Sequence, residues 1–326
     1  MPKSYKICAF IVSILILIFI VASQSNNKNN ALPLIAIANY GPHSSLQETI
    51  YGIKEKLETL GYIENQNIRY EIADVNFDTS LIIQMLNKLK SHRPDILVTL
   101  STPIAQSAKN MIKDIPVIFT DVTDPESAGL ISNDLDSNIT GASDRQNLKL
   151  MLQFAQQLLP KTKIVGVLYS TGEANDISML EMLTKSAEQL DIEVIAVPVE
   201  HTRDVVSRMK LLKNKVDFIY TGSSGAIQAS LPAIISVAES MKLPLFNFNG
   251  EEVIEHNALA SFGVSHKKVG ANAAQIIHRI FKGEKPENIK VMHPNNSDHK
   301  GFISQKRAER IGLKIPSNLT QITIVK

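Results

Sequence analysis

Short apolar runs alternate with amphipathic stretches along most of this 326-residue chain. The first run, residues 34–38, precedes a stretch in which Leu46, Ile50, Ile53 and Leu57 recur at spacings of three and four. That spacing is typical of one apolar helical face, and the glycine at position 61 is expected to end the helix. The pattern predicts a buried strand followed by an amphipathic helix.

The same unit recurs further along the chain. Strands are predicted at residues 68–73, 96–100, 115–119, 164–169, 193–197, 218–220 and 245–247, and helices at 80–90, 103–111, 147–158, 176–190, 205–212 and 226–241. Because each parallel connection needs a crossover helix, this alternation predicts parallel sheets. The rhythm restarts in the middle of the chain, which predicts an α/β protein with two doubly wound lobes.

The last quarter of the chain has a different order: a strand at 260–264, a helix at 269–281, a strand at 289–292 and a helix at 304–311. These elements are too few for a third domain, so we expect them to join the two existing sheets through a hinge of several segments. The predicted first lobe comprises residues 32–122 with 263–286, and the second comprises 123–262 with 287–326. The cleft between the lobes is the expected functional site.

The N-terminus has the pattern of an export signal. Two lysines precede an apolar run at residues 7–22, and small residues end it at 21–23. We predict a signal peptide over residues 1–23, followed by a polar linker at 24–31. The alternative is an uncleaved membrane anchor, but the run has 16 residues and a spanning helix needs about 20. With either outcome the rest of the chain is expected outside the cytoplasm, in the periplasm.

Charge and cysteine content exclude several classes of protein. The formal net charge is +2, and removal of the two leader lysines leaves 32 basic and 32 acidic residues. A neutral body gives no electrostatic reason to expect nucleic acid as a partner. The only cysteine is Cys8, inside the leader, so the exported chain has no thiol for catalysis or metal binding. A lipoprotein would need a cysteine just after the apolar run.

Ligands of open α/β sheets bind beyond the carboxyl ends of the strands. Ser101 and Thr102 follow the third predicted strand there, and Pro103 occupies the first helical turn. Free backbone N–H groups and the helix dipole at such a turn favour a ligand carboxylate. The alternative is a simple helix N-cap.

Further candidates follow other strands. They are Asp124 after the fourth strand, Ser143 and Asp144 after a polar stretch, and Tyr169 with Asn175 at the end of the strand over 164–169. Singly, each could be turn and capping chemistry. Together they suggest a cleft with an aspartate for an ammonium group and a helix N-terminus for a carboxylate. Such a cleft would suit an amino acid.

Catalytic and metal-binding arrangements are weak by comparison. The stretch Gly222-Ser223-Ser224-Gly225 lacks the spacing of a nucleophile elbow, and Ser223 is kept as a ligand-binding candidate only. The histidines are scattered without metal-ligand spacing. His43 is the one histidine that follows a strand end; it is a further candidate, with a solvated loop residue as the alternative. We therefore expect no catalytic site, no metal and no cofactor.

A series of short motifs runs in order along residues 34–315: Leu60-Gly61-Tyr62, Ser101-Thr102-Pro103, Pro116-Val117-Ile118-Phe119, Val122-Thr123-Asp124-Pro125, Asn138-Ile139-Thr140-Gly141, Gly166-Val167-Leu168-Tyr169 and Phe262-Gly263-Val264. This order resembles the ABC transporter substrate-binding family, which includes the tryptophan-binding TrpX-like proteins. The resemblance implies a type I periplasmic-binding fold whose lobes close on a small ligand. It also implies delivery to an ABC permease in the membrane with its ATPase.

By position, the resemblance places Thr102, Asp124, Ser143, Asp144 and Asn175 in the cleft. The chain also departs from the family. It has Ser223-Ser224-Gly225 where members often carry Asp-Asn-Thr, and Ser265-His266-Lys267 where they often carry Asp-Tyr-Tyr. Both departures remove an acid or aromatic side chains near the expected cleft. The expected ligand is therefore an amino acid, aromatic or otherwise.

Three other classes of protein are alternatives to a transport receptor. A transcription regulator of the same fold would need a helix-turn-helix before the first strand, where this chain has an apolar leader. An exported enzyme would need a nucleophile, a base or a metal set. A ligand-binding sensor subunit for a membrane signalling partner stays open, because it would use the same cleft and the same closure.

Overall fold

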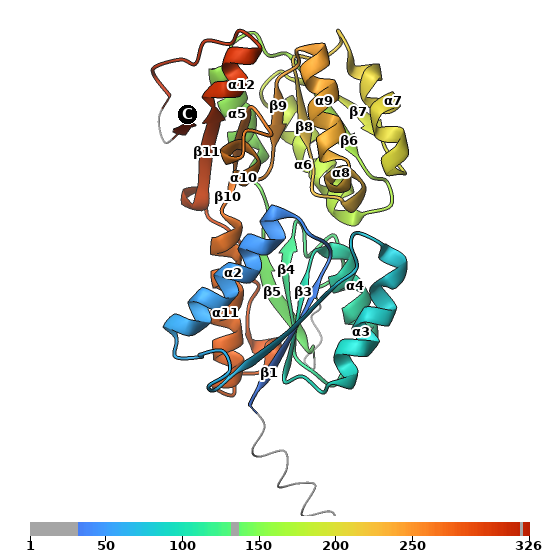
Figure 1. Ribbon diagram of the computed structural model, residues 1–326, viewed down its shortest axis with the longest axis vertical. Coiled ribbons are helices and arrows are strands. Elements are labelled where there is room, and N and C mark those ends of the chain that lie inside the picture. The colour runs from blue at the N-terminus through green and yellow to red at the C-terminus, as the bar shows by residue number, and fades with distance from the viewer. Residues whose placement is uncertain (1–31, 132–136, 320–321) are drawn as a thin grey trace, which may run out of the picture.

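The computed structural model describes residues 32–131, 137–319 and 322–326 (Figure 1). The predicted leader and the whole predicted linker lie outside these residues. Within the described ranges, none of the helices combines the length and the apolar character needed to cross a bilayer. Two lobes lie one above the other, each with a sheet flanked by helices. The predicted class, two-lobed α/β with mainly parallel sheets, is confirmed.

The first lobe is built on a five-stranded sheet in the order β2-β1-β3-β4-β5, with every neighbouring pair parallel. Its strands are β1 (Leu34–Asn39), β2 (Arg69–Asp74), β3 (Ile96–Leu100), β4 (Val117–Val122) and β5 (Ile139–Ser143). Its helices are α2 (Ser44–Thr59), α3 (Ile82–Ser91), α4 (Thr102–Met111) and α11 (His266–Phe281). Helices α2 and α11 lie on one side of the sheet, and α3 and α4 on the other (Figure 1).

The second lobe is built on a seven-stranded sheet in the order β12-β11-β10-β9-β8-β6-β7. Its strands are β6 (Ile164–Tyr169), β7 (Glu193–Pro198), β8 (Phe218–Thr221), β9 (Leu245–Asn247), β10 (Ala260–Val264), β11 (His299–Ser304) and β12 (Ile322–Val325). Its helices are α5 (Leu148–Leu158), α6 (Ala174–Glu188), α7 (Val205–Met209), α8 (Gly225–Ala229), α9 (Leu231–Met241), α10 (Glu251–Ile254) and α12 (Gln305–Arg310). The pair β10–β11 is antiparallel, because the chain enters β11 from the first lobe.

The chain crosses between the lobes three times, and the crossings differ from the predicted boundaries. Strand β5 pairs with β4, so β5 belongs to the first lobe and the first crossing follows Ser143. The third crossing follows Met292, because Ile289 packs in the first core and its carbonyl accepts a hydrogen bond from Thr140 Oγ1 at 2.7 Å. β5 escaped prediction because its run mixes Thr, Gly and Ser with few apolar residues.

Other differences from the sequence pattern have local causes. The predicted helix over 226–241 is divided into α8 and α9, and Pro232 lies in the first turn of α9. The predicted strand over 289–292 forms only an isolated bridge from Met292 to Ala142. Strands β11 and β12 were not predicted; β11 contains His, Lys and Gly, and it is recognised only through its pairing with β10.

Two glycines bring α2 and α11 into direct backbone contact. A Cβ atom at Gly52 would lie 2.1 Å from the carbonyl oxygen of Lys267, and one at Gly270 would lie 2.1 Å from that of Thr49. Neither distance leaves room for a side chain. The close packing places the N-terminal ends of the two helices side by side, at the edge of the first lobe that faces the second lobe (Figure 1).

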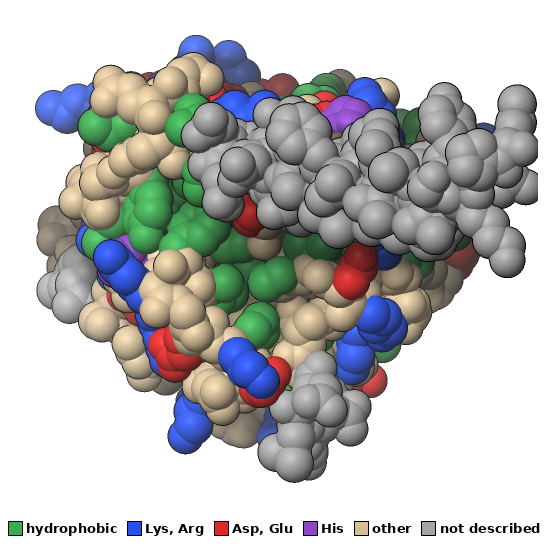
Figure 2. All heavy atoms as spheres, turned by 90° about the horizontal axis from the view of Figure 1, so that it is seen from below, with side chains coloured by type: hydrophobic (Ala, Val, Ile, Leu, Met, Phe, Trp, Pro, Cys, Tyr) green, Lys and Arg blue, Asp and Glu red, His purple; other side chains and the backbone are tan. Residues whose placement is uncertain are grey.

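The opposite end of the first lobe carries charges of both signs. Figure 2 shows Lys and Arg side chains interspersed with Asp and Glu around hydrophobic side chains on this face. The described part of the face therefore has no patch of a single sign, which agrees with the near-neutral composition.

Candidate ligand-binding site

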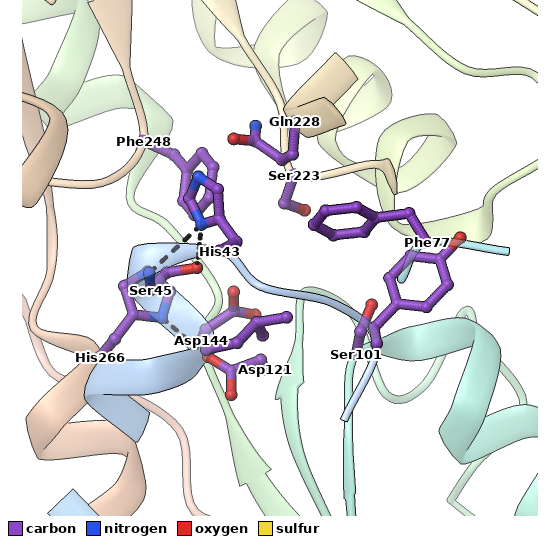
Figure 3. Close-up of a pocket in the computed structure, with 12 residues that line it drawn as sticks. His43, Ser45, Phe77, Ser101, Asp121, Asp144, Ser223, Gln228, Phe248 and His266 are labelled. Atoms are coloured by element: carbon purple, nitrogen blue, oxygen red, sulfur yellow. Dashed lines mark hydrogen bonds and ion pairs between the residues drawn. The ribbon is translucent and has the colours of Figure 1, made fainter. Parts of the chain in front are cut away.

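A small cavity lies between the lobes, at the carboxyl ends of β1, β3 and β4. Both lobes contribute to its wall (Figure 3). The lining residues are Tyr40, His43, Ser45, Leu46, Phe77, Ser101, Asp121, Asp144, Ser223, Gln228, Phe248 and His266. We call it the cleft cavity. A wider depression beside it shares Tyr40 and Phe77, so these two aromatic residues stand between the cavity and a larger opening.

The backbone is strained at two of the lining residues. Ser101 has φ of 81° and Asp121 has φ of 53°, both in the left-handed region that residues other than glycine rarely adopt. Asp121 also marks a shift in the register between β4 and β5. Such strain costs on the order of 1–3 kcal/mol and persists where the surrounding structure imposes it. Here it coincides with the cleft cavity.

Asp121 and His266 form a buried pair. Nδ1 of His266 lies 2.7 Å from Oδ1 of Asp121, and the Thr49 hydroxyl donates to the same oxygen at 2.9 Å. Since an ionised carboxylate only accepts hydrogen bonds, Nδ1 carries the proton. Burial by itself would lower the pKa of His266, but the hydrogen bond to Asp121 and the charges of Asp121 and Asp144 raise it above its usual value.

Asp144 is a buried carboxyl group with a free oxygen. The residue is 4% exposed, and among the described residues its Oδ1 has no hydrogen-bond partner. Burial, reinforced by the charge of Asp121, raises the pKa of Asp144 to about 7. An unpaired buried carboxylate is costly unless a positive group joins it. A cationic group bound in the cavity would therefore be stabilised by Asp144.

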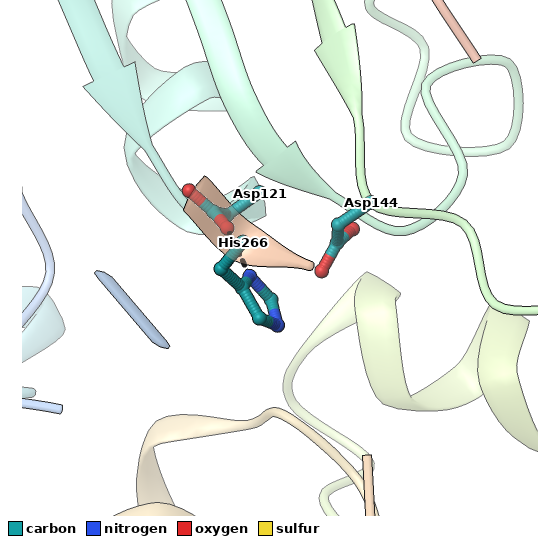
Figure 4. Close-up of side chains that lie close together, drawn as sticks. All are labelled: Asp121, Asp144 and His266. Atoms are coloured by element: carbon teal, nitrogen blue, oxygen red, sulfur yellow. Dashed lines mark hydrogen bonds and ion pairs between the residues drawn. The ribbon is translucent and has the colours of Figure 1, made fainter. Parts of the chain in front are cut away.

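Asp121, Asp144 and His266 were also considered as metal ligands. Their potential ligand atoms all lie within 4.8 Å of one another (Figure 4). A metal ion would have to displace a proton from His266, whose pKa the neighbouring carboxylates raise. Two donors already engage Oδ1 of Asp121. The cluster suits a ligand ammonium group better than a metal ion.

His43 is an N-cap and not the solvated loop residue considered as its alternative. Its Nδ1 accepts from the backbone N–H of Ser45 at 3.2 Å, and its ring stacks on Phe248 with 5.9 Å between centroids. Burial, followed by the charge of His266, lowers the pKa of His43 to about 4. His43 is therefore neutral at physiological pH, and its proton lies on Nε2, 3.5 Å from a Glu252 oxygen of the second lobe.

Polar contacts join the two lobes around the cavity. The Tyr40 hydroxyl donates to Glu173, which also accepts from the backbone N–H of Gly225 at 2.8 Å. On the other side, the Ser44 hydroxyl donates to Glu252 at 2.9 Å and accepts from an Asn249 amide at 2.8 Å. The contacts of Tyr40 and Ser44 exist only while the lobes are together, so they stabilise the closed arrangement.

The structure brings five of the nine predicted site residues to the cavity or into contact with its wall. Ser101, Asp144, Ser223 and His43 line it. Asn175 lies directly behind, where its amide donates to the Ser223 hydroxyl at 3.2 Å.

Four predicted residues do not line the cavity. Asp124 accepts from an Arg145 guanidinium nitrogen at 2.6 Å. The Ser143 hydroxyl donates to the Val122 carbonyl at 2.8 Å. Thr102 is buried in the first turn of α4, and Tyr169 packs against the core of the second lobe.

Six lining residues with polar or aromatic side chains were missed. They are Tyr40, Ser45, Phe77, Asp121, Gln228 and Phe248. Three of them, Tyr40, Asp121 and Phe248, lie at or directly after strand ends, so the strand-end rule could have found them. His266 was noted only as a departure from the family pattern, since its place in the cleft depends on a lobe crossing.

The chain matches the family described as ABC transporter substrate binding protein over residues 34–324. A Tyrosine-binding protein from Clostridioides difficile (strain R20291) is 30% identical over 274 residues, covering 83% of this chain and 79% of that protein.

Two solved structures superpose on most of this chain. An ABC domain in complex with L-Trp from Streptococcus pneumonia superposes with a TM-score of 0.82 at 28% identity, covering 90% of this chain and 100% of that chain. The ligand-free, open structure of CD0873 from Clostridium difficile, described as a substrate binding protein with adhesive properties, gives 0.68 at 26% identity, with 90% and 99% covered.

Proposed function

Because the chain belongs to the ABC transporter substrate-binding protein family, we propose that it binds an amino acid between its lobes and delivers it to an ABC permease with its ATPase. The family match confirms two predictions from the sequence: the resemblance carried by the short motifs, and a binding protein rather than an enzyme. Export to the periplasm, directed by a signal peptide over residues 1–23, is part of the same proposal.

The observation that carries the amino acid assignment is the free carboxyl oxygen of Asp144. It lies in a cavity whose walls come from both lobes, and its neighbour Asp121 is already bonded to His266. An ammonium group would neutralise Asp144 and satisfy its oxygen. Sugars lack such a group, so the buried carboxyl favours an amine-bearing ligand over a neutral polyol.

The remaining wall supports an apolar or aromatic side chain on the ligand. Phe77, Phe248 and Tyr40 line the cavity, and aromatic rings contribute large contact areas at low entropic cost. Relatives point the same way: one is named a tyrosine-binding protein and another was solved with L-Trp. We propose a neutral amino acid, with tyrosine and tryptophan as the first candidates.

Lobe closure is the proposed mechanism. The contacts of Tyr40 with Glu173 and of Ser44 with Glu252 join the lobes around the cavity, and a ligand there would add contacts to both lobes. Only a ligand with higher affinity for the closed form can shift the equilibrium towards it. The permease would then distinguish the loaded protein by the relative position of its lobes.

A ligand screen tests the proposal. The melting temperature of the purified protein is measured with the twenty L-amino acids, with sugars and with nucleobases, because a ligand that binds the folded state raises it. We expect stabilisation by one or a few neutral amino acids, followed by a dissociation constant from calorimetry. Stabilisation by a sugar or a nucleobase alone would contradict the assignment.

A further inference from the structure

We propose that His266 is a specificity-determining residue, which makes the cleft cavity select α-amino acids over the corresponding amines without a carboxylate. The proposal rests on the function proposed above and adds a partner for the ligand's carboxylate. Two aspartates alone would bind any cation, including an amine without a carboxylate. The third member of the cluster, the imidazole of His266, adds a group that can bind the carboxylate.

The orientation of His266 is fixed by its neighbours. Asp121 holds Nδ1 at 2.7 Å, and Asp121 is itself held by the Thr49 hydroxyl. Phe248 packs edge-on against the imidazole ring, with 5.6 Å between centroids. The ring therefore has one position, in which Nδ1 serves Asp121 and Nε2 is left for another partner.

Nε2 of His266 is a buried group awaiting an acceptor. The side chain is 1% exposed, and within the described part of the chain Nε2 has no hydrogen-bond partner. The pair with Asp121 favours the protonated imidazole, in which Nε2 can only donate. A buried cationic donor without a partner is costly. A ligand carboxylate would supply the missing acceptor.

Asp144 and His266 together match the two charges of an α-amino acid. Oδ1 of Asp144 is an unpartnered acceptor and Nε2 of His266 an unpartnered donor, and the two side chains belong to one cluster within 4.8 Å (Figure 4). An α-amino acid carries its ammonium and carboxylate on one carbon atom, so both can be satisfied in this small space. An amine would satisfy Asp144 and leave His266 unpaired.

The N-terminus of α4 is the competing site for the carboxylate. The buried Thr102 hydroxyl there also has no hydrogen-bond partner within the described part of the chain, but two of the backbone positions cannot donate to a ligand. The Ser101 N–H already donates to the Thr120 carbonyl at 3.0 Å, and Pro103 has no N–H to offer. In Figure 3, Ser101 and His266 lie on opposite sides of the two aspartates. The two sites can therefore be separated by mutation.

The test compares matched ligand pairs by calorimetry: L-tyrosine with tyramine, and L-tryptophan with tryptamine. We expect the wild-type protein to prefer the amino acid by about 100-fold, since a ligand that leaves a buried polar group unpaired is strongly rejected. His266→Gln, which removes the positive charge, should reduce this ratio to about tenfold or less. Ser101→Ala is the comparison at the competing site, and it lowers the ratio only if the carboxylate binds at α4.

Several results would overturn the proposal. One is an unchanged ratio in His266→Gln with both affinities lowered equally, which would indicate a purely structural role. Another is loss of the ratio in Ser101→Ala, which would place the carboxylate at α4. A third is a rise in melting temperature with Zn²⁺ that His266→Gln abolishes, which would assign the cluster to a metal ion. Failure of every amino acid to bind the wild-type protein would instead refute the proposed function.

Discussion

The hydroxyl of Tyr40 in the first lobe lies 3.1 Å from Oε1 of Glu173 in the second lobe, to which it donates a hydrogen bond. Burial raises the pKa of Tyr40, so the hydroxyl keeps its proton and remains a donor. The contact closes one side of the cleft cavity. The contact therefore couples lobe closure to ligand affinity. A ligand that binds only the closed form has a higher apparent affinity when other contacts stabilise that form.

Tyr40→Phe should weaken ligand binding by about 1 kcal/mol, which is about fivefold in dissociation constant. The variant removes the hydroxyl and keeps the ring, which lies edge-on to Phe77 with 5.5 Å between centroids. Calorimetry with the ligand found in the screen measures the effect. An affinity equal to that of the wild-type protein would mean that the Tyr40–Glu173 bond does not stabilise the loaded form.

Gly225→Ala should weaken binding more than Tyr40→Phe does. A Cβ atom at Gly225 would lie 2.8 Å from the Tyr40 hydroxyl and 2.9 Å from its ring, so the lobes could not close without moving that side chain. Small-angle scattering should show a larger radius of gyration with saturating ligand. Gly172→Ala is the matched control, because the nearest atom to its new Cβ is Ser170 Oγ at 3.7 Å. Equal behaviour of the two variants would argue against a steric block.

Closure of the ligand-free protein should become less favourable as the pH rises through about 7. Burial, followed by the charge of Asp176, raises the pKa of Glu173 from 4.5 to about 7 in the closed form. Below about pH 4.5 the carboxyl is protonated in both forms, so its contribution to closure is fully present. Above 7 the closed form must bury the ionised group, and that contribution is lost.

Scattering between pH 5 and 8 would measure this dependence as a growing radius of gyration. Asp144 and Asp176 titrate in the same range, with pKa values of about 7 and about 6. Glu173→Gln, which cannot ionise, isolates the contribution of Glu173 and should flatten the profile. Identical profiles for the variant and the wild-type protein would exclude Glu173 as the group responsible.

Asp144→Asn should weaken binding of an amino acid by about 2–5 kcal/mol, the usual cost of losing one partner of a buried charge pair. Because Asp144 must be ionised to pair with ammonium and its pKa is about 7, affinity of the wild-type protein should fall by up to about tenfold per pH unit below 7. Asp124→Asn is the control: Asp124 pairs with Arg145 outside the lining. A greater loss with Asp124→Asn than with Asp144→Asn would move the ammonium site to Asp124.

Gly52→Ala should destabilise the protein despite the higher helix propensity of alanine. The new Cβ would lie 2.1 Å from the Lys267 carbonyl, and overpacking of this kind costs typically about 1–3 kcal/mol. Urea unfolding measures the change. Gln47→Ala, at an exposed position of the same helix, should be neutral. An unaffected unfolding midpoint for Gly52→Ala would mean that α2 and α11 can separate freely.

The sequence supported prediction best where a pattern is local. The face of Leu46, Ile50, Ile53 and Leu57 does pack into the first core as part of α2. Elements without such a pattern were missed: β5 mixes polar and small residues, and it is a strand because β4 pairs with it. The lobe boundary shifted for the same reason, since pairing partners and not residue types assign a segment to a sheet.

The candidate site shows the same division between local and distant information. Ser101, Asp144, Ser223 and His43 were found because loops at the carboxyl ends of parallel strands converge on one edge. Asp124 also follows a strand end, but its carboxylate pairs with Arg145. The spacing of residues in the sequence does not predict this partner. Capping and ligand binding use the same residue types, so the sequence pattern could not separate them.

By itself, the sequence determined that this chain forms two α/β lobes with polar groups at their facing ends, because the periodicities of helix and strand are properties of neighbouring residues. Only the tertiary structure decided that Asp121 meets His266 across 145 residues of chain. That meeting requires α11 to return to the first lobe and to pack on α2 at Gly52 and Gly270. Contacts between distant segments are set by such packing, which leaves no periodic signal in the sequence.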